Sequence, residues 1–167
     1  TTASRGISNA SVPAGSILQI QSTTKTDVFT LASGTWTDVP GLSVNITPTS
    51  ATSKIYIFAT VQMSGSAGAY ATHPRVTRNG NVITGMLSTQ VGTRAQAMAM
   101  VETNTQMAIP SPFQYLDSPA TTSLLTYQFQ IRNNGSATSK VNASDADTDN
   151  SSWSRSFSTI TVMEIAQ

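Results

Sequence analysis

Few residues in this chain of 167 could take part in catalysis. There is no cysteine, which argues against thiol catalysis, disulfide bonds and cysteine-ligated zinc. The only histidine, His73, stands before Pro74 in YATHPRV, and a lone histidine carries no signature of a metal site or a catalytic triad. Eight acidic residues are scattered along the chain, and no two are marked out as the facing pair that a glycosidase needs. The sequence therefore predicts a protein that binds without catalysing a reaction.

One acidic segment has spacing that suits a metal ion. Asp145, Asp147 and Asp149 are two residues apart in NASDADTDNSSW. Calcium takes several oxygen ligands from closely spaced carboxylates, and three like charges so close together repel one another without a cation. The glycine and the closing glutamate of an EF-hand are missing, and a solvated loop is the alternative. We state a weak calcium site as a hypothesis, and no other cofactor is expected.

The aromatic residues outside the strands indicate a recognition surface. Tyr70, Tyr115 and Trp153 lie in segments rich in Ser, Gly and Asn that we expect to be turns. Aromatic rings among small polar residues are typical of adaptable recognition loops, and rings also stack on the apolar faces of sugars. Together with His73 they are the predicted receptor-binding residues, although ordinary turn packing would give the same pattern. Trp36 is expected in the core at a strand end.

Composition limits the class of protein and its partners. Hydrophobic residues make up 38% of the chain and charged residues 10%, with a net charge of +1. Such a weak charge does not recruit nucleic acid or an anionic membrane. No apolar run approaches the roughly 20 residues that a membrane-spanning helix needs, so no membrane insertion is expected. Ser and Thr fill many of the remaining positions, and the abundance of β-branched residues indicates an all-β domain.

Apolar residues recur every second position in several segments, which is the period of a half-buried strand. The clearest hairpin is residues 75–85, because Asn79-Gly80 favours a type I′ turn. In residues 94–102 alanines alternate with Gln and Met, and a strand fits this period better than the alternative helix. The other expected strands are residues 16–22, 42–48, 54–63, 123–133 and 156–167. About eight to ten short strands without helices predict an antiparallel β-sandwich or jelly roll.

Some apolar residues exceed what the core of one chain requires and are candidates for a subunit interface. The strand at 54–63 carries Tyr56 and Phe58 on the face opposite its aliphatic residues, so we expect both of its faces to be buried near its start. The small side chains of residues 95, 97 and 99 and the methionines at 98 and 100 are candidates for the core and a subunit interface, in either order. A large apolar interface is typical of an obligate oligomer, and we expect a homotrimer.

The segments PAGSILQIQSTTKTDVFT and WTDVPGLSVNITPTSATSKIYIFATV, with the closing STITVMEIAQ, resemble the C-terminal domain of bacteriophage tail fibre proteins, especially those of marine phages. The resemblance implies a trimeric, knob-like β-sandwich on the virion surface that contacts a glycan or protein receptor on a host cell. It also implies that residues 1–14 are a linker or extended arm from a longer fibre and that residues 15–167 are the sandwich domain. No set of receptor-contacting residues carries over, because those loops vary.

Other functions fit the same pattern. A structural capsid, decoration or head-fibre protein with a jelly roll would have the same Ser- and Thr-rich surface. A depolymerase acting on surface glycan would need paired carboxylates in a groove. A cellular trimeric signalling ligand with a similar fold is the remaining alternative.

Overall fold

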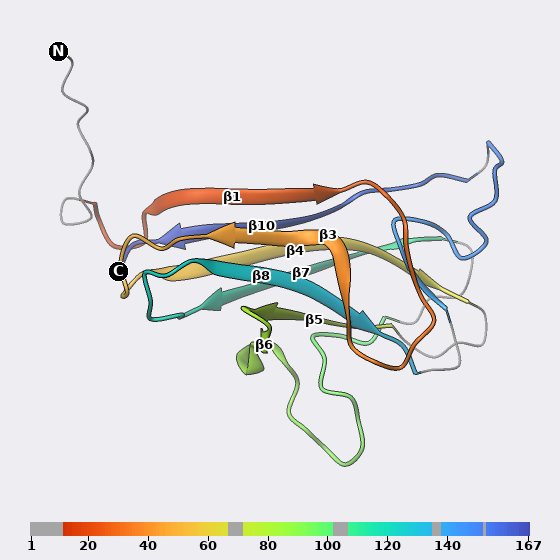
Figure 1. Cartoon of the computed structure of the whole chain (residues 1–167), viewed down its shortest axis with the longest axis horizontal. Coiled ribbons are helices and arrows are strands. Elements are labelled where there is room, and N and C mark those ends of the chain that lie inside the picture. Colours follow the sequence, from red (N-terminus) through yellow and green to blue (C-terminus); the bar gives the residue numbers. More distant parts are fainter. Residues whose placement is uncertain (1–11, 67–71, 102–106, 135–137, 152) are drawn as a thin grey trace.

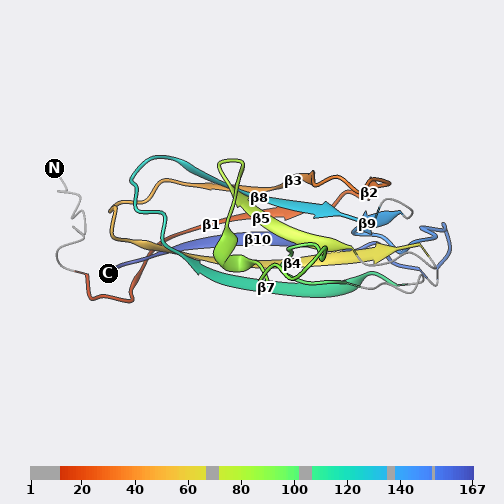
Figure 2. The same ribbon diagram turned by 90° about the horizontal axis from the view of Figure 1, so that it is seen from below.

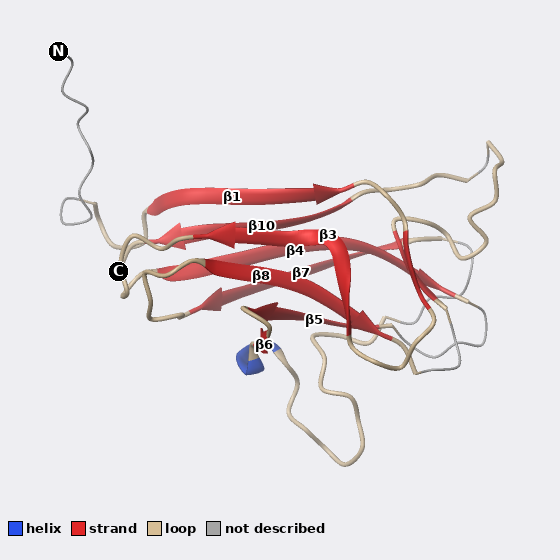
Figure 3. Cartoon of the chain, viewed as in Figure 1, coloured by secondary structure: helices blue, strands red, loops and turns tan. Residues whose placement is uncertain are grey.

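The computed structural model describes residues 12–66, 72–101, 107–134, 138–151 and 153–167. It is an antiparallel β-sandwich of two packed sheets, which confirms the predicted all-β class (Figures 1 and 3). The strands in the described part of the chain are β1 (Ile17–Lys25), β2 (Phe29–Leu31), β3 (Thr37–Ile46), β4 (Lys54–Gly65), β5 (His73–Arg78), β6 (Asn81–Val82), β7 (Ile109–Asp117), β8 (Leu125–Arg132), β9 (Ser139–Val141) and β10 (Ser158–Ile165). A single 3-10 turn, η2 (Thr84–Met86), is also described. None of the described helical residues could span a membrane.

The two sheets form separate layers, which are seen edge-on in Figure 2. The larger sheet has the strand order β1-β10-β4-β9-β2, with β7 also paired to β4, and the smaller sheet has the order β3-β8-β5-β6. The last strand, β10, lies between β1 and β4, with Ile160 opposite Ala59 and Met163 opposite Ile20. This position confirms the expectation that the apolar C-terminal strand is paired inside a sheet. Both edges of β10 itself are hydrogen-bonded to neighbouring strands.

The core forms where the apolar faces of the two sheets meet, because alternate residues of a strand point to the same side. The buried face of β4 is at most 1% exposed and has the predicted members Ile55, Ile57, Ala59, Val61 and Met63. The smaller sheet contributes Leu42, Val44, Ile46, Leu125, Tyr127, Phe129 and Ile131. These are the faces that the two-residue period predicts.

The hairpin between β5 and β6 has the predicted turn. Thr77 pairs with Val82 and Arg78 with Asn81, so Asn79 and Gly80 are the two loop residues. Their φ angles are 49° and 77°, the positive values that a type I′ turn requires at both positions. Glycine meets this requirement without a steric penalty, and asparagine tolerates it better than most residues.

Residues 94–101 do not form the predicted strand. They run beside the start of β5, where the amide of Met98 donates to the carbonyl oxygen of Pro74 (2.9 Å) and Thr72 and Val101 exchange two bonds of 2.9 Å. Pro74 has no N–H to return a bond to this segment, so a regular ladder cannot continue past it. Ala97 is buried, Met98 is partly buried and Met100 is 69% exposed. The alanines at 95, 97 and 99 and the methionines at 98 and 100 therefore do not divide into one buried set and one exposed set.

Both ends of the segment 83–101 pack against the core, whereas residues 88–94 between them are exposed. Ile83 is buried in the core, and Met86 and Met98 pack against it. The α-carbon of Gly85 faces the ring of Tyr115 from β7, and the Tyr115 hydroxyl fills the space that a Cβ would need. A glycine at this position lets the chain cross closely over the aromatic ring.

The outer face of the larger sheet is apolar in part and is not covered by another layer of the described chain. One cross-strand row runs through Ile20, Met163, Tyr56 and Leu116, and the next row contains Phe58. Ile20 is 53%, Leu116 44% and Phe58 37% exposed. The expectation that both faces of β4 are buried is therefore wrong for the single chain, because the second sheet packs on one side only.

Two buried carboxylates tie the layers together. Asp117 at the end of β7 accepts two bonds from Arg78 Nη1 (2.7 and 2.6 Å) and one from the hydroxyl of Tyr127 (2.7 Å). Glu164 in β10 is fully buried and accepts bonds from Gln19 Nε2 and from both the amide and the hydroxyl of Thr49, all at 2.7 Å. Buried charges are tolerated when they are hydrogen-bonded in this way.

Candidate functional site

The candidate site is the segment between β9 and β10, which lies at the end of the sandwich opposite the C-terminus (Figure 1). It begins at Asn142, a buried residue with a φ of 68°. Asn142 Nδ2 donates to the carbonyl oxygens of Lys25 (2.9 Å) and Asp27 (3.0 Å), and its Oδ1 accepts from Ser158 Oγ at 2.5 Å. One amide side chain thus holds both ends of the segment against the turn that follows β1.

An internal ion pair fixes the shape of the segment beyond Asn142. Arg155 donates from Nε to Asp147 Oδ1 and from Nη2 to Asp147 Oδ2, both at 3.0 Å. The amide of Asp147 donates to the Oγ of Ser144 (3.1 Å), and Lys140 Nζ donates to the carbonyl oxygen of Asp145. The hydrogen bonds from Arg155 hold the pKa of Asp147 below its ordinary value. A carboxylate held by a two-pronged guanidinium is poorly suited to act as a catalytic base while the pair is intact.

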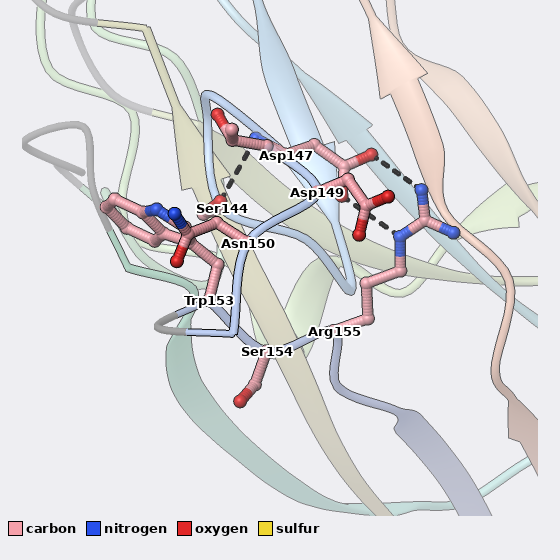
Figure 4. A pocket seen from close by; sticks show the side chains of 8 residues that line it. Ser144, Asp147, Asp149, Asn150, Trp153, Ser154 and Arg155 are labelled. Atoms are coloured by element: carbon pink, nitrogen blue, oxygen red, sulfur yellow. Dashed lines mark hydrogen bonds and ion pairs between the residues drawn. The ribbon is translucent and has the colours of Figure 1, made fainter.

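This braced segment encloses a pocket of about 470 Å³ (Figure 4). Its lining contains one aromatic ring, one carboxamide, two carboxylates, one guanidinium and three hydroxyls. The residues that we call the Trp153 pocket are Ser144, Asp147, Thr148, Asp149, Asn150, Trp153, Ser154 and Arg155. Trp153 is half-buried, and its amide donates to the carbonyl oxygen of Asn150 at 3.0 Å. The pocket therefore offers a ring for stacking together with hydrogen-bond donors and acceptors.

The three aspartates predicted to bind calcium all lie in or beside this segment. No group of three acidic or histidine side chains in the described part of the chain is close enough to hold a metal ion. Asp147 is engaged by Arg155, and Asp149 is exposed on the rim of the pocket. The spacing of two residues does not bring the three carboxylates together, because the chain turns between them and Asp147 has a φ of 43°.

Of the other predicted receptor-binding residues, His73 and Tyr115 do not line the Trp153 pocket. Tyr70 lies outside the described residues. Tyr115 lies in β7 and not in a turn, and its ring packs against the core beneath Gly85. His73 begins β5 on the smaller sheet and lines a separate, mostly apolar pocket of about 570 Å³ beside Met98. Burial lowers the pKa of His73, and the nearby charge of Arg132 lowers it further.

Trp36 is not part of the core, contrary to expectation. It is half-buried on the outer face of the smaller sheet, where the guanidinium carbon of Arg75 lies 4.1 Å from the centroid of its ring. The sequence contains no local signal for this arrangement, because the arginines that cover Trp36 come from strands distant in the chain.

No protein-family model matches this chain, and a search of curated proteins found no match.

Proposed function

We propose that this chain is the receptor-binding domain of a fibre on a virion surface and that it binds a host-cell glycan in the Trp153 pocket without catalysis. The observation that carries the proposal is the composition of that pocket, in which a tryptophan lies among amide, carboxylate and hydroxyl groups. Aromatic rings and polar side chains in a concave site can bind the apolar and hydroxyl faces of a sugar together.

The bracing of the pocket supports a binding role. Binding costs less free energy when the loop is already ordered, because fewer side chains lose freedom on contact. The Asp147–Arg155 pair and the anchor at Asn142 supply this order before any ligand arrives. The low charge of the domain also suits a neutral ligand, whose binding would change little with salt.

A glycan array, followed by calorimetric titration of the best neutral glycan, tests this function. Trp153→Ala removes the ring and is expected to abolish binding at millimolar ligand. Phe157→Ala is the matched control, because Phe157 is an exposed aromatic in the same segment that does not line the pocket. An empty array, together with no binding to intact candidate host cells, would overturn the proposal. Equal binding by the Trp153→Ala variant would show that the glycan does not bind in the Trp153 pocket.

The proposal includes a homotrimer, and the outer face of the larger sheet is its candidate interface. The row through Ile20, Met163, Tyr56 and Leu116 contains no charged residue, so copies of the chain could meet there without like-charge repulsion. Light scattering at micromolar concentration should give three times the chain mass. Phe58→Glu should lower that mass, because association would bury an unpaired charge in the interface. A wild-type monomer would refute the trimer.

A structural role in a capsid, as a decoration or as a head fibre is the second candidate, and the same apolar face favours it. Electron microscopy of the purified chain distinguishes the structural role from the attachment function. Closed shells or ordered particles would support the structural role, whereas discrete small oligomers that bind a glycan would support attachment.

A further inference from the structure

Two arginines from different strands lie against one tryptophan on the outer face of the smaller sheet. The guanidinium carbon of Arg75 in β5 is 4.1 Å from the centroid of the Trp36 ring, and that of Arg132 at the end of β8 is 5.9 Å away. The strand register places Arg132 opposite His73 and Arg75 opposite Gln130. The fold thus concentrates positive charge on a chain whose net charge is only +1.

Neither guanidinium group forms a direct ion pair with a carboxylate of the described residues, although the charge of Asp38 acts on Arg75. Arg75 Nε donates to Gln130 Oε1 (2.6 Å), and Gln130 Nε2 donates to Asp38 Oδ1 (2.6 Å), so an amide stands between Arg75 and Asp38. Arg132 Nε donates to the carbonyl oxygen of Asn133 at 3.3 Å. The three ion pairs of the described chain involve neither arginine. The terminal nitrogens of both groups therefore remain available as donors.

The same residues line a pocket of about 380 Å³, which we call the Trp36 pocket. Its opposite wall comes from the segment after β6 and adds a third arginine, Arg94, together with the polar side chains of Thr84, Gln90, Thr93 and Gln96. None of the described residues that line it is acidic. The volume falls within the range of small-ligand sites and exceeds what a bare ion requires.

The positive charges of Arg75 and Arg132 repel one another, and a bound anion would offset this repulsion. Burial lowers the pKa of Arg75, the charge of Asp38 opposes this effect, and the charge of Arg132 adds to it. An opposite charge placed between two crowded cations stabilises their charged forms. Guanidinium groups also match planar and tetrahedral oxyanions with paired hydrogen bonds.

We propose that the Trp36 pocket is a second binding site, separate from the Trp153 pocket, for a sugar that carries an oxyanion substituent. Arg75 and Arg132 bind the anionic group, and the amides and hydroxyls of residues 84–96 contact the sugar ring. The anionic group is a carboxylate or a sulfate ester, because both present the same charged oxygens to a guanidinium. This inference goes beyond the proposed attachment function and does not depend on it.

Calorimetric titration of the full chain with four probes tests the site. The probes are methyl glucuronide, glucose 6-sulfate, the neutral methyl glucoside and inorganic sulfate. We expect one or both acidic sugars to bind, the glucoside not to compete with them, and sulfate alone to bind more weakly. Which acidic sugar binds identifies the anionic group. Arg132→Gln and Arg75→Gln should each weaken binding about tenfold or more. Lys54→Gln is the matched control, because it removes one positive charge from β4, in the other sheet.

Each remaining outcome has a defined meaning. Arg132→Lys keeps the charge but loses the paired donors, so an intermediate affinity supports direct contact. Absence of binding by both acidic sugars, or equal weakening by Lys54→Gln, would overturn the proposal. Equal affinity for sulfate and the acidic sugars would overturn the sugar-binding part. Loss of neutral-glycan binding in Trp153→Ala bears only on the first site, so the two proposals can fail separately.

Discussion

The hydroxyl of Tyr127 donates a hydrogen bond of 2.7 Å to Asp117, and this contact joins β8 of one sheet to β7 of the other. Tyr127 is fully buried, and Arg78 binds the same carboxylate. Burial raises the pKa of Tyr127, with a further contribution from Asp117, so the phenol stays protonated as a donor at all ordinary pH values. The two sheets are therefore held by a directional contact as well as by apolar packing.

Removing that hydroxyl should destabilise the fold. Tyr127→Phe keeps the ring but deletes one donor to a buried charged acceptor, which should cost about 2 kcal/mol. Chemical denaturation is the measurement, and the slope with denaturant should stay unchanged. Thr126→Val is the control, because its hydroxyl donates to Asn45 Oδ1 on the exposed face of the smaller sheet and its loss should cost little. Equal stability of the two variants would contradict a structural role for the Asp117 contact.

Asn142 should be more sensitive to alanine than to glycine. Both substitutions delete the amide that satisfies the carbonyl oxygens of Lys25 and Asp27. Alanine must also adopt a φ of 68°, which costs about 1 kcal/mol or more, whereas glycine adopts it freely. Thermal unfolding should rank the wild type first, Asn142→Gly second and Asn142→Ala third. The reverse order of the two variants would show that backbone strain is unimportant there.

Glu164 should make stability depend on pH in the acid range. Burial opposes its ionisation, but hydrogen bonds from Gln19, Ser53 and Thr49 outweigh burial and hold the pKa of Glu164 below its ordinary value. A lowered pKa in the folded state means that the unfolded chain binds the proton more readily. Stability is therefore full above the unfolded pKa, roughly 4.3, and falls as the pH drops through the folded pKa.

The matching variant is Glu164→Gln. It should be less stable at neutral pH and should show a shallower loss of stability in acid. Denaturation midpoints from about pH 3 to 7 measure both effects. A parallel pH dependence in the two proteins would mean that Glu164 does not contribute to it.

His73 should contribute a second pH dependence, nearer neutrality. Its pKa is lowered by burial and by Arg132, so the neutral imidazole is favoured in the folded protein. Arg94 lines the same pocket, and no acidic residue of the described chain does. Stability should fall as the pH drops from the unfolded pKa, about 6.5, through the folded value.

His73→Gln should remove this dependence between about pH 5 and 7.5. Nuclear magnetic resonance titration of the single histidine gives the folded pKa directly. A folded pKa above that of a model peptide would contradict the expected sign.

Calcium should have little effect on this domain. Arg155 already neutralises Asp147, and the three aspartates of the segment do not form a cluster. We expect no change in the unfolding temperature with millimolar calcium or with a chelator. Arg155→Gln removes the competing charge and serves as the comparison. A clear rise in the wild-type unfolding temperature with calcium would revive the metal site inferred from spacing.

Alternation in the sequence predicts the core strands β4 and β8 but not β7, where Tyr115 is expected in a turn. Ile55 to Met63 in β4 and Leu125 to Ile131 in β8 are buried as the period of two requires, and Asn79-Gly80 forms the expected turn. Residues 94–101 have the same alternation without forming a strand, because Pro74 cannot extend the ladder beside them. Periodicity reports which face is apolar, whereas strand formation also depends on the partner.

The candidate sites were less predictable than the strands. Trp153 was identified from its polar neighbours, and its neighbours in sequence also form its pocket. The sequence places Trp36 in the core at a strand end, but its ring lies on the outer face of the smaller sheet. Arg75 and Arg132 cover the ring of Trp36. The two arginines lie close together because β5 pairs with β8, and no local pattern in the sequence reveals this pairing.

The first described residues and the C-terminal residues lie together at one end of the sandwich. The amide of Gly15 donates to the carbonyl oxygen of Ala166 (2.8 Å), and the amide of Ala166 donates to the carbonyl oxygen of Ser16 (2.9 Å). The segment between β9 and β10, which lines the Trp153 pocket, lies at the other end (Figure 1). A purification tag, fluorophore or carrier protein joined after the C-terminal residue would therefore lie away from the Trp153 pocket. The domain could be immobilised on a sensor chip or displayed on a nanoparticle with its pocket facing outward.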